Sequence, residues 1–483
     1  MILIFKKRLL RIFPFIGTLV LSALLGLFFH ASHAGEMPLG KWLQAAGLHH
    51  KQVGVAILDL GSAAPVFLSN ADEPLNPAST MKVLTTYAAL SLLGPNYRWR
   101  TQFFLGKPLD GDVLPGDLII KGGGDPKMVI EDVQELVLKL RAKGLRDIRG
   151  DILLDASIYD VGEQSVEPFD GDPTQPYNVR PNAALMNFKA TNFIVGPGPQ
   201  GLNVRMDPEL ADVALEVDVK MVTGPCRHGV TGLSIRDDAS PKAARILVSG
   251  LYSSACGEQG NYVSVLTHQQ FIQAFFKSAW LAAGGSYAGQ TRFVKDVSFK
   301  NLKPWFVWES PRNLADAVRD VNKFSNNVMA RQMLLQLSYE MTKLPATPER
   351  ARNALVTWLK NRGLHFPEMH IDNGAGLSRT ERLSALHLAT LLKDAAASPV
   401  ASILKESFPL VGVDGTMRSR LSRDPIASNA WIKTGSIAAV RSIAGYVRSV
   451  SGREFAVVVL VNGPKAEGSQ LLQDQILKWV HAQ

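Results

Sequence analysis

The sequence is poor in cysteine, with Cys226 and Cys256 as its only two, and it holds no cluster of His, Cys and Asp residues with the spacing of metal ligands. We therefore predict no structural zinc and no cofactor. The sequence also lacks any basic run with interleaved aromatic residues, which argues against nucleic acid as a partner. It has neither internal repeats nor low-complexity tracts, so nothing points to a repeat protein or to a disordered one.

Acidic residues are absent from the start of the chain, where none precedes Glu36. This stretch opens with the basic sequence KKRLLR, continues with an apolar run from Ile12 to Phe29, and reaches small residues at Ser32-His33-Ala34. The pattern predicts a signal peptide over residues 1–34 and a periplasmic location. A retained membrane anchor is the alternative, because the apolar run is nearly long enough to span a bilayer.

The middle of the chain differs in pattern from its two ends. Short β-like runs such as DLIIKGGG and ALEVDVKMV recur there, separated by turns rich in Gly, Pro, Asp and Asn. We predict that residues 97–299 form an inserted, mainly β region with two nested subdomains. Both cysteines lie in it. In an oxidising compartment we expect Cys226 and Cys256 to form one disulfide, with two buried free thiols as the alternative.

The two ends of the chain together predict one α+β domain. Two short strands are expected between Lys51 and Ser69, helices follow from Ser79 and again from Asn313, and three strands and a last helix close the chain. Strands from both ends suit one antiparallel sheet with helices packed on it. We therefore predict a domain made of residues 35–96 and 300–483, interrupted by the insertion.

The first candidate site is Ser79-Thr80-Met81-Lys82, at the start of an apolar helical run. At a helix start, free N–H groups and the positive dipole end favour a developing negative charge near Ser79. Lys82 lies three positions later on the same face, and a neutral amine there can take the hydroxyl proton if burial or a nearby cation lowers its pKa. Taken alone the motif is weak, because Ser79 suits a simple N-cap equally well.

Two further motifs follow in the chain. Ser325-Asn326-Asn327 opens another helical run, where capping is the alternative reading. Lys433-Thr434-Gly435-Ser436 lies in a β-like run, where Gly435 would let another backbone approach and the lysine and hydroxyls suit a carboxylate; an edge strand with a solubilising lysine is the alternative. The order of the three motifs is more specific than any one of them.

This order resembles that of class A β-lactamases and penicillin-binding proteins. The long interval between Ser79 and Ser325 is similar to that of the low-molecular-mass class C group, the D-alanyl-D-alanine carboxypeptidase/endopeptidases of the penicillin-binding protein 4 type. Further stretches carry the same resemblance: Gly122 to Pro126, Asp372 to Arg379, and Gly412 to Thr416. One departure is Asn373-Gly374-Ala375-Gly376, where the family pattern predicts Asp-Gly-Ser-Gly.

The resemblance implies the fold and the roles of the motif residues. The fold would be a penicillin-binding, serine β-lactamase-like transpeptidase domain, an antiparallel sheet packed with helices, with a large, mainly β insertion. Ser79 would attack the penultimate D-alanine carbonyl with Lys82 as its base, and Ser325 would pass the proton to the leaving amine. The remaining expected site residues are Asn327 and Lys433 in the polar network, Thr434, Gly435 and Ser436 at the substrate carboxylate, and Arg379 and Asp155 at the stem peptide.

Arg379 and Asp155 have plain alternatives, a salt-bridging arginine and a turn aspartate. The implied partners are peptidoglycan stem peptides and β-lactam inhibitors, while homo-oligomer formation and association with a membrane surface stay open. Three other functions remain: a transpeptidase, a β-lactamase, and a catalytically dead wall-binding scaffold. The sequence has no Glu-x-x-Leu-Asn stretch to supply a deacylating carboxylate, which argues against a β-lactamase, and the intact motifs argue against a scaffold.

Overall fold

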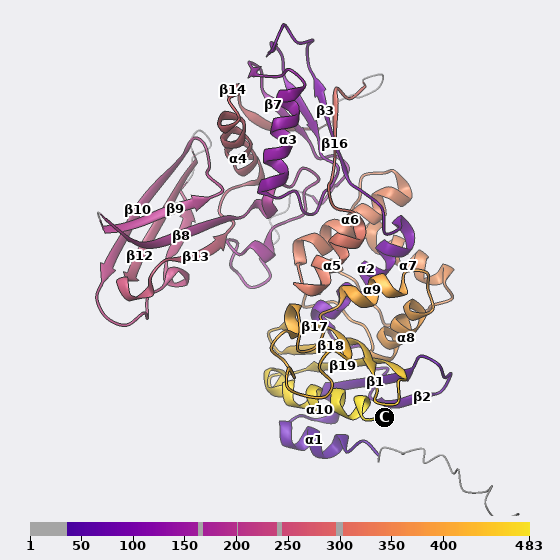
Figure 1. Cartoon of the computed structure of the whole chain (residues 1–483). Helices are drawn as coiled ribbons and strands as arrows, with labels where there is room; N and C mark the ends of the chain where they lie inside the picture. The colour runs from indigo at the N-terminus through magenta and orange to yellow at the C-terminus, as the bar shows by residue number, and fades with distance from the viewer. Residues whose placement is uncertain (1–35, 163–167, 200, 239–243, 296–302) are drawn as a thin grey trace, which may run out of the picture.

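The computed structural model describes residues 36–162, 168–199, 201–238, 244–295 and 303–483 (Figure 1). The signal peptide predicted at residues 1–34 lies outside these ranges. Within them, no helix is both long enough and apolar enough to cross a membrane.

A five-stranded antiparallel sheet joins the two ends of the chain, in the order β17-β18-β19-β1-β2. Its strands are β17 (Ala430–Ile437), β18 (Val440–Arg448), β19 (Glu454–Asn462), β1 (Val53–Asp59) and β2 (Pro65–Ser69). Side chains of a strand alternate between the two faces of its sheet. In β19, Ala456, Val458 and Leu460 accordingly enter one core, while neighbours such as Val457 and Val459 enter another.

Helices cover both faces of this sheet (Figure 1). On one face lies α10 (Gln470–His481) with α1 (Leu39–Ala46) against it, and on the other lies α8 (Ala385–Ala396). Around α8 the helical layer continues with α2 (Lys82–Leu93), α5 (Leu314–Lys323), α6 (Asn327–Thr342), α7 (Pro348–Asn361) and α9 (Ala401–Ser407). Helix α2 is buried from Lys82 to Leu90, as its all-round apolar sequence predicts.

The inserted region forms the part drawn at the top and left of Figure 1. Its largest sheet has the order β15-β7-β5-β3-β16, comprising β15 (Thr291–Val294), β7 (Ile152–Asp155), β5 (Leu118–Lys121), β3 (Arg100–Leu105) and β16 (Phe306–Glu309). A small parallel sheet joins β14 (Ser286–Tyr287), β6 (Asp147–Ile148) and β4 (Val113–Leu114). Two helices, α3 (Ile130–Ala142) and α4 (His268–Ala282), share the core of this region.

Two three-stranded sheets occupy the chain between β7 and α4. One has β10 (Val213–Val222), β12 (Ala244–Ser253) and β11 (Ser234–Asp237). The other has β13 (Gln259–Val263), β8 (Thr191–Gly198) and β9 (Gly201–Asp207). Cys226 and Cys256 form a disulfide just beyond the paired ends of β10 and β12. We propose that these sheets are the inner of two nested subdomains.

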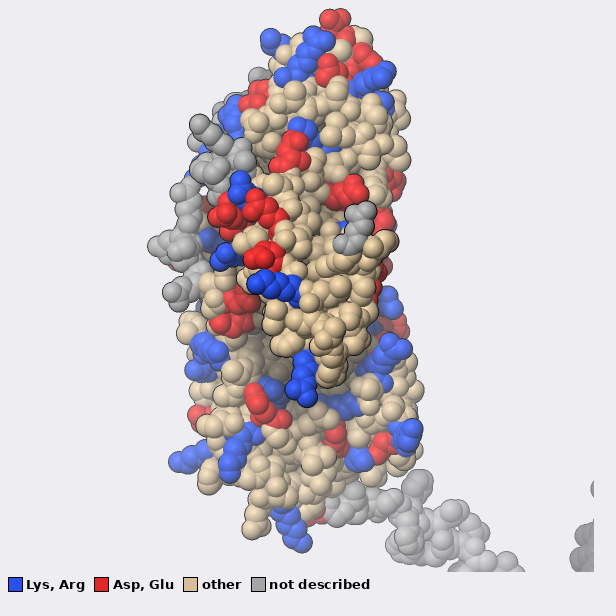
Figure 2. Space-filling model, turned by 90° about the vertical axis from the view of Figure 1, so that its left-hand side faces the viewer, with Lys and Arg blue, Asp and Glu red and all other residues tan. Residues whose placement is uncertain are grey.

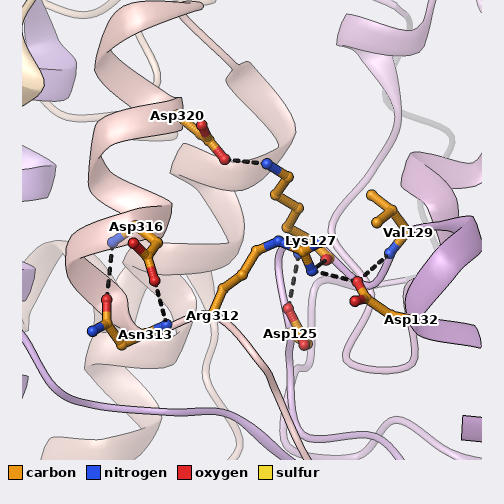
Figure 3. Close-up of polar contacts among 8 residues, drawn as sticks. All are labelled: Asp125, Lys127, Val129, Asp132, Arg312, Asn313, Asp316 and Asp320. Atoms are coloured by element: carbon orange, nitrogen blue, oxygen red, sulfur yellow. Dashed lines mark hydrogen bonds and ion pairs between the residues drawn. The ribbon is translucent and has the colours of Figure 1, made fainter. Parts of the chain in front are cut away.

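The sequence places the end of the insertion at residue 299. Strand β16 pairs with β3 in the largest inserted sheet, so we propose that the insertion ends at Glu309. Beyond it, polar contacts attach the inserted region to α5 (Figure 3). Lys127 pairs with Asp320 of α5, and Arg312, just before α5, pairs with Asp132 at the start of α3.

Candidate active site

Ser79 lies in a tight turn that leads into α2. A 3₁₀ helix covers Ala78–Met81 and α2 begins at Lys82, so Ser79 precedes the regular helix by one turn. Ala78 has a φ of +44°, which is strained for a residue with a side chain. Such strain persists where the surroundings hold it, and it sets the backbone that presents Ser79.

Two glycines make room for that backbone. A Cβ at Gly376 would lie 1.8 Å from the Ala78 carbonyl oxygen, and one at Gly435 would lie 2.9 Å from the Ser79 nitrogen. Gly376 also has a φ of +77°, in the left-handed region that favours glycine. Strand β17 and the loop before Gly376 therefore close on the Ser79 backbone from two sides, which no larger residue would allow.

Lys82 is completely buried, and its ammonium nitrogen meets only uncharged groups. Its Nζ lies 3.0 Å from Ser79 Oγ and 2.6 Å from Asn327 Oδ1, and it also donates to the Ala375 carbonyl. Burial lowers the pKa of Lys82 well below its ordinary value, the Lys433 ammonium lowers it further, and the Glu381 carboxylate raises it. A lowered pKa favours the neutral amine, which can accept the Ser79 proton.

Ser325 and Lys433 form a second contact, which is partly buried. Ser325 connects α5 to α6 with a φ of +56°, and Lys433 Nζ donates to its Oγ at 2.9 Å and to the Thr434 carbonyl at 2.6 Å. Burial lowers the pKa of Lys433 to about 7. Lys323 anchors the preceding turn, because its Nζ binds both carboxylate oxygens of Asp414, at 2.8 and 2.7 Å.

Strand β17 lies at one edge of the catalytic sheet, which suits the addition of a substrate strand. Its first residues are bonded on the outer side, where the Ile432 N–H donates to the Pro409 carbonyl at 2.8 Å. Further along, Ser436 is exposed and lines the cleft, and the Thr434 hydroxyl lies 2.7 Å from that of Thr416. These hydroxyls, with Lys433 beside them, could bind a carboxylate.

A cleft of about 850 Å³ opens over these residues, and the catalytic and inserted regions both line it. Figure 2 shows the molecule hollowed below the protruding inserted region on this side. The motif residues at its surface are Ser325, Asn327 and Ser436, and aromatic residues stand around them: Phe169, Tyr177, Phe188, Tyr262 and Phe324. Sequence reasoning missed this aromatic lining, because only Phe324 adjoins a motif.

Of the two residues expected at the stem peptide, the structure brings only Arg379 to the cleft. The Arg379 guanidinium lies 4.4 Å from the centre of the Phe169 ring, between the cleft and a second cavity of about 420 Å³. Asp155 is 3% exposed and lines neither cavity. Its carboxylate accepts the Ser157 N–H at 2.8 Å, as a turn aspartate does.

Within the described ranges, no three His, Cys, Asp or Glu side chains are grouped so that they could hold a metal ion. The site instead combines two serine hydroxyls, two buried lysines and an asparagine amide. A nucleophile in contact with a buried amine is the arrangement that acyl transfer requires.

Comparison with known proteins agrees with this chemistry. The sequence model of the D-Ala-D-Ala carboxypeptidase 3 (S13) family matches residues 37–483. The chain is 22% identical to D-alanyl-D-alanine carboxypeptidase DacB of Haemophilus influenzae over 80% of each protein, and 24% identical to a D-alanyl-D-alanine carboxypeptidase of an Actinomadura species over 88% of this chain and 80% of the other.

Solved structures show the same fold. The crystal structure of penicillin binding protein 4 from H. influenzae matches with a TM-score of 0.74 at 22% identity, covering 92% of this chain and 100% of the other. A predatory endopeptidase from Bdellovibrio bacteriovorus matches with a TM-score of 0.52 at 15% identity, covering 88% and 91%. These likenesses confirm the predicted α+β fold with its large insertion.

Proposed function

Because this chain belongs to the D-Ala-D-Ala carboxypeptidase 3 (S13) family, it is a serine-type D-Ala-D-Ala carboxypeptidase, and we propose how its residues carry out the reaction. Lys82, in its neutral form, takes the proton of Ser79 as Oγ attacks the penultimate D-alanine carbonyl. The contact that carries this proposal is the one of 3.0 Å between Lys82 Nζ and Ser79 Oγ, in a site where no carboxylate of the described residues lies within hydrogen-bond distance of Lys82.

The negative charge formed by this attack is stabilised by N–H groups. The backbone N–H groups of Ser79 and Ser436 are our candidates for the oxyanion hole, since Gly435 places β17 against the Ser79 nitrogen. The peptide would lie along β17 as an added strand, with its terminal carboxylate at Thr434 and Ser436. A substrate bound in this way presents its last peptide bond to Ser79.

The acyl-enzyme then forms with release of D-alanine, and water hydrolyses it in a second step. The carbon–nitrogen bond breaks as Ser325 passes to the leaving amine a proton that Lys82 has taken, and D-alanine departs. Water next attacks the ester, Lys82 again accepts a proton, and Ser79 is released with its hydrogen restored. Lys433 supports the relay through its contact with Ser325, and Asn327 holds Lys82 in place.

We further propose peptidoglycan stem peptides as the substrates, β-lactams as acylating inhibitors, and the periplasm as the compartment. The cleft continues from Ser436 to Tyr262 of the inserted region, which offers room beyond the scissile bond. This room supports endopeptidase activity on cross-linked peptides in addition to carboxypeptidase activity. Arg379, at the cleft wall, is our candidate for contact with the stem.

Intact-mass measurement after incubation with a penicillin tests the proposed chemistry. We expect a stable one-to-one adduct on the wild type and none on Ser79→Ala, while Ser402→Ala, which changes an exposed serine of α9, forms the adduct normally. Rapid drug turnover without an adduct would indicate a β-lactamase. If neither an adduct nor drug turnover is observed, a catalytically dead wall-binding scaffold becomes the best-supported function.

A further inference from the structure

Glu381 is a completely buried acid that the reaction outlined above does not use. Its Oε1 accepts three consecutive backbone N–H groups, from Asp372 at 3.3 Å, Asn373 at 3.0 Å and Gly374 at 2.8 Å. Its Oε2 is buried and has no hydrogen-bond partner among the described residues. A buried carboxylate oxygen without a hydrogen-bond partner lowers the stability of the fold, so the presence of this acid needs an explanation.

The loop that Glu381 holds is the one that contacts the catalytic base. Immediately after the three bonded N–H groups, the Gly374 carbonyl accepts the Thr85 hydroxyl at 2.7 Å and the Ala375 carbonyl accepts Lys82 Nζ. Thr85 lies one turn beyond Lys82 on α2. One side of the loop is therefore bound to Glu381, and the other side is bound to the helix that carries the base.

Asn373 completes the loop in a way that suits a neighbouring acid. Its Oδ1 accepts the Ala375 N–H and its Nδ2 donates to the Leu377 carbonyl, both at 2.9 Å. A carboxylate at position 373 could not make the second bond, and it would add a further negative charge to those of Glu381 and Asp372. The amide at this position thus leaves Glu381 as the buried acid of the loop.

Glu381 also influences the base through its charge. Burial raises the pKa of Glu381 to about 7, the three N–H groups oppose this rise, and Asp372 adds to it. The charged groups that interact with Glu381 are Asp372, Lys82 and Arg331. When ionised, Glu381 raises the pKa of Lys82 and so disfavours the neutral amine.

We propose that Glu381 is a positioning residue for Lys82: its carboxylate holds the Asp372–Ala375 loop so that the Ala375 carbonyl orients the base toward Ser79. This inference rests on the proposed role of Lys82. It adds a residue for which the three catalytic motifs provide no signal.

The test is the rate of acylation by a penicillin as a function of pH for Glu381→Gln and Glu381→Ala. Gln keeps an oxygen that can accept the three N–H groups and removes the charge, so we expect a plateau rate within about threefold of the wild type and an acid limb moved to lower pH. Ala removes the acceptor, and the misplaced base should cost on the order of 10²-fold at the plateau. Glu368→Gln is the matched control, since Glu368 accepts the Ser384 N–H and pairs with His387 outside the loop, and its profile should follow the wild type.

Thermal unfolding of each variant separates a lost fold from a misplaced base. A folded Glu381→Ala enzyme within threefold of the wild type would overturn the proposal, as would a Glu381→Gln enzyme as slow as Glu381→Ala. If Glu381→Ala does not fold, the acid limb of Glu381→Gln decides: a shift to lower pH supports the proposal, and no shift overturns it. Failure of the wild type to form an adduct at Ser79 would instead reject the proposed function, and the role of Glu381 with it.

Discussion

Two groups of buried and half-buried cations in this molecule differ in their partners. In the catalytic cluster, Lys82 and Lys433 are completely buried and donate to hydroxyl, amide and carbonyl oxygens. At the junction with the inserted region, Lys127 and Arg312 each pair with an aspartate (Figure 3). A cation beside a carboxylate keeps its charge and supports the fold, whereas a buried amine among neutral oxygens loses affinity for its proton.

Lys323 shows the same contrast at shorter range. It is nearly as buried as Lys433 and lies two positions before Ser325, yet Asp414 binds it through both carboxylate oxygens. Lys323 therefore anchors the turn, while Lys433 contacts the hydroxyl of Ser325 that the turn presents. The partner of a lysine, more than its burial, separates a structural role from a chemical one.

The largest effect we predict comes from Lys82→Ala. Loss of the base should slow acylation by at least about 10³-fold, and stability should change little, because a buried lysine without a counter-ion contributes little to the fold. Lys127→Ala is the matched variant at the junction, where we expect acylation within about twofold of the wild type. Mass spectrometry of the penicillin adduct over time, with thermal unfolding, measures both. Acylation of Lys82→Ala above a tenth of the wild-type rate would break the comparison.

A smaller effect should appear in the pH dependence of acylation. The rate should rise with pH, because Lys82 must lose its proton before it can accept that of Ser79, and its lowered pKa brings this rise to a lower pH than for an ordinary lysine. Lys433→Gln removes the cation that lowers the pKa of Lys82, so its acid limb should move to higher pH, opposite to Glu381→Gln. Stopped-flow or quenched-flow measurement of the acylation rate over a range of pH gives the position of the acid limb. If the acid limb of Lys433→Gln moved to lower pH, the predicted effect of the Lys433 charge on the pKa of Lys82 would be wrong.

The smallest effect on activity should come from the junction. Arg312→Leu leaves Asp132, whose side chain is 5% exposed, without its cation, and should lower the free energy of unfolding by about 2 kcal/mol because Arg312 itself is partly exposed. Acylation should stay within about twofold of the wild type. Urea unfolding gives the stability, and Arg312→Leu combined with Asp132→Asn should recover part of the loss. If the single variant instead slowed acylation as much as Lys82→Ala does, the junction would have to be counted with the catalytic cluster.

Much of the fold could be predicted because its signals are local. The short strand-like runs near Lys51 and after Ala430 predicted a sheet from both chain ends, and the structure pairs β1 with β19. Strand β16 was missed, since a four-residue run gives too little periodicity to assign. Ser79 was expected at a helix start, but the tight approach of Gly376 and Gly435 leaves it in a 3₁₀ turn before α2.

The site residues also fall into those that the sequence predicted and those that it did not. The motifs named Ser79, Lys82, Ser325, Asn327 and Lys433, and the structure places their side chains in two sets of contacts, Lys82 with Ser79 and Asn327, and Lys433 with Ser325. Asp155 does not line the cleft, and its carboxylate accepts the N–H of Ser157, so its contact with the stem peptide stays a prediction from the resemblance. Glu381 and Tyr262 carried no sequence signal, since neither belongs to a motif and each reaches the site only through the packing of a distant segment.

The sequence by itself determined which side chains can do acyl chemistry and which segments form strands and helices, because residue type, order and periodicity are written along the chain. Only the tertiary structure decided which lysines would lack a carboxylate partner. Burial and the distance to a counter-ion arise from segments far apart in sequence: Lys82 meets Ala375 and Asn327, while Lys127 meets Asp320. The pKa of an amine depends on those neighbours and not on the residues beside it in the chain.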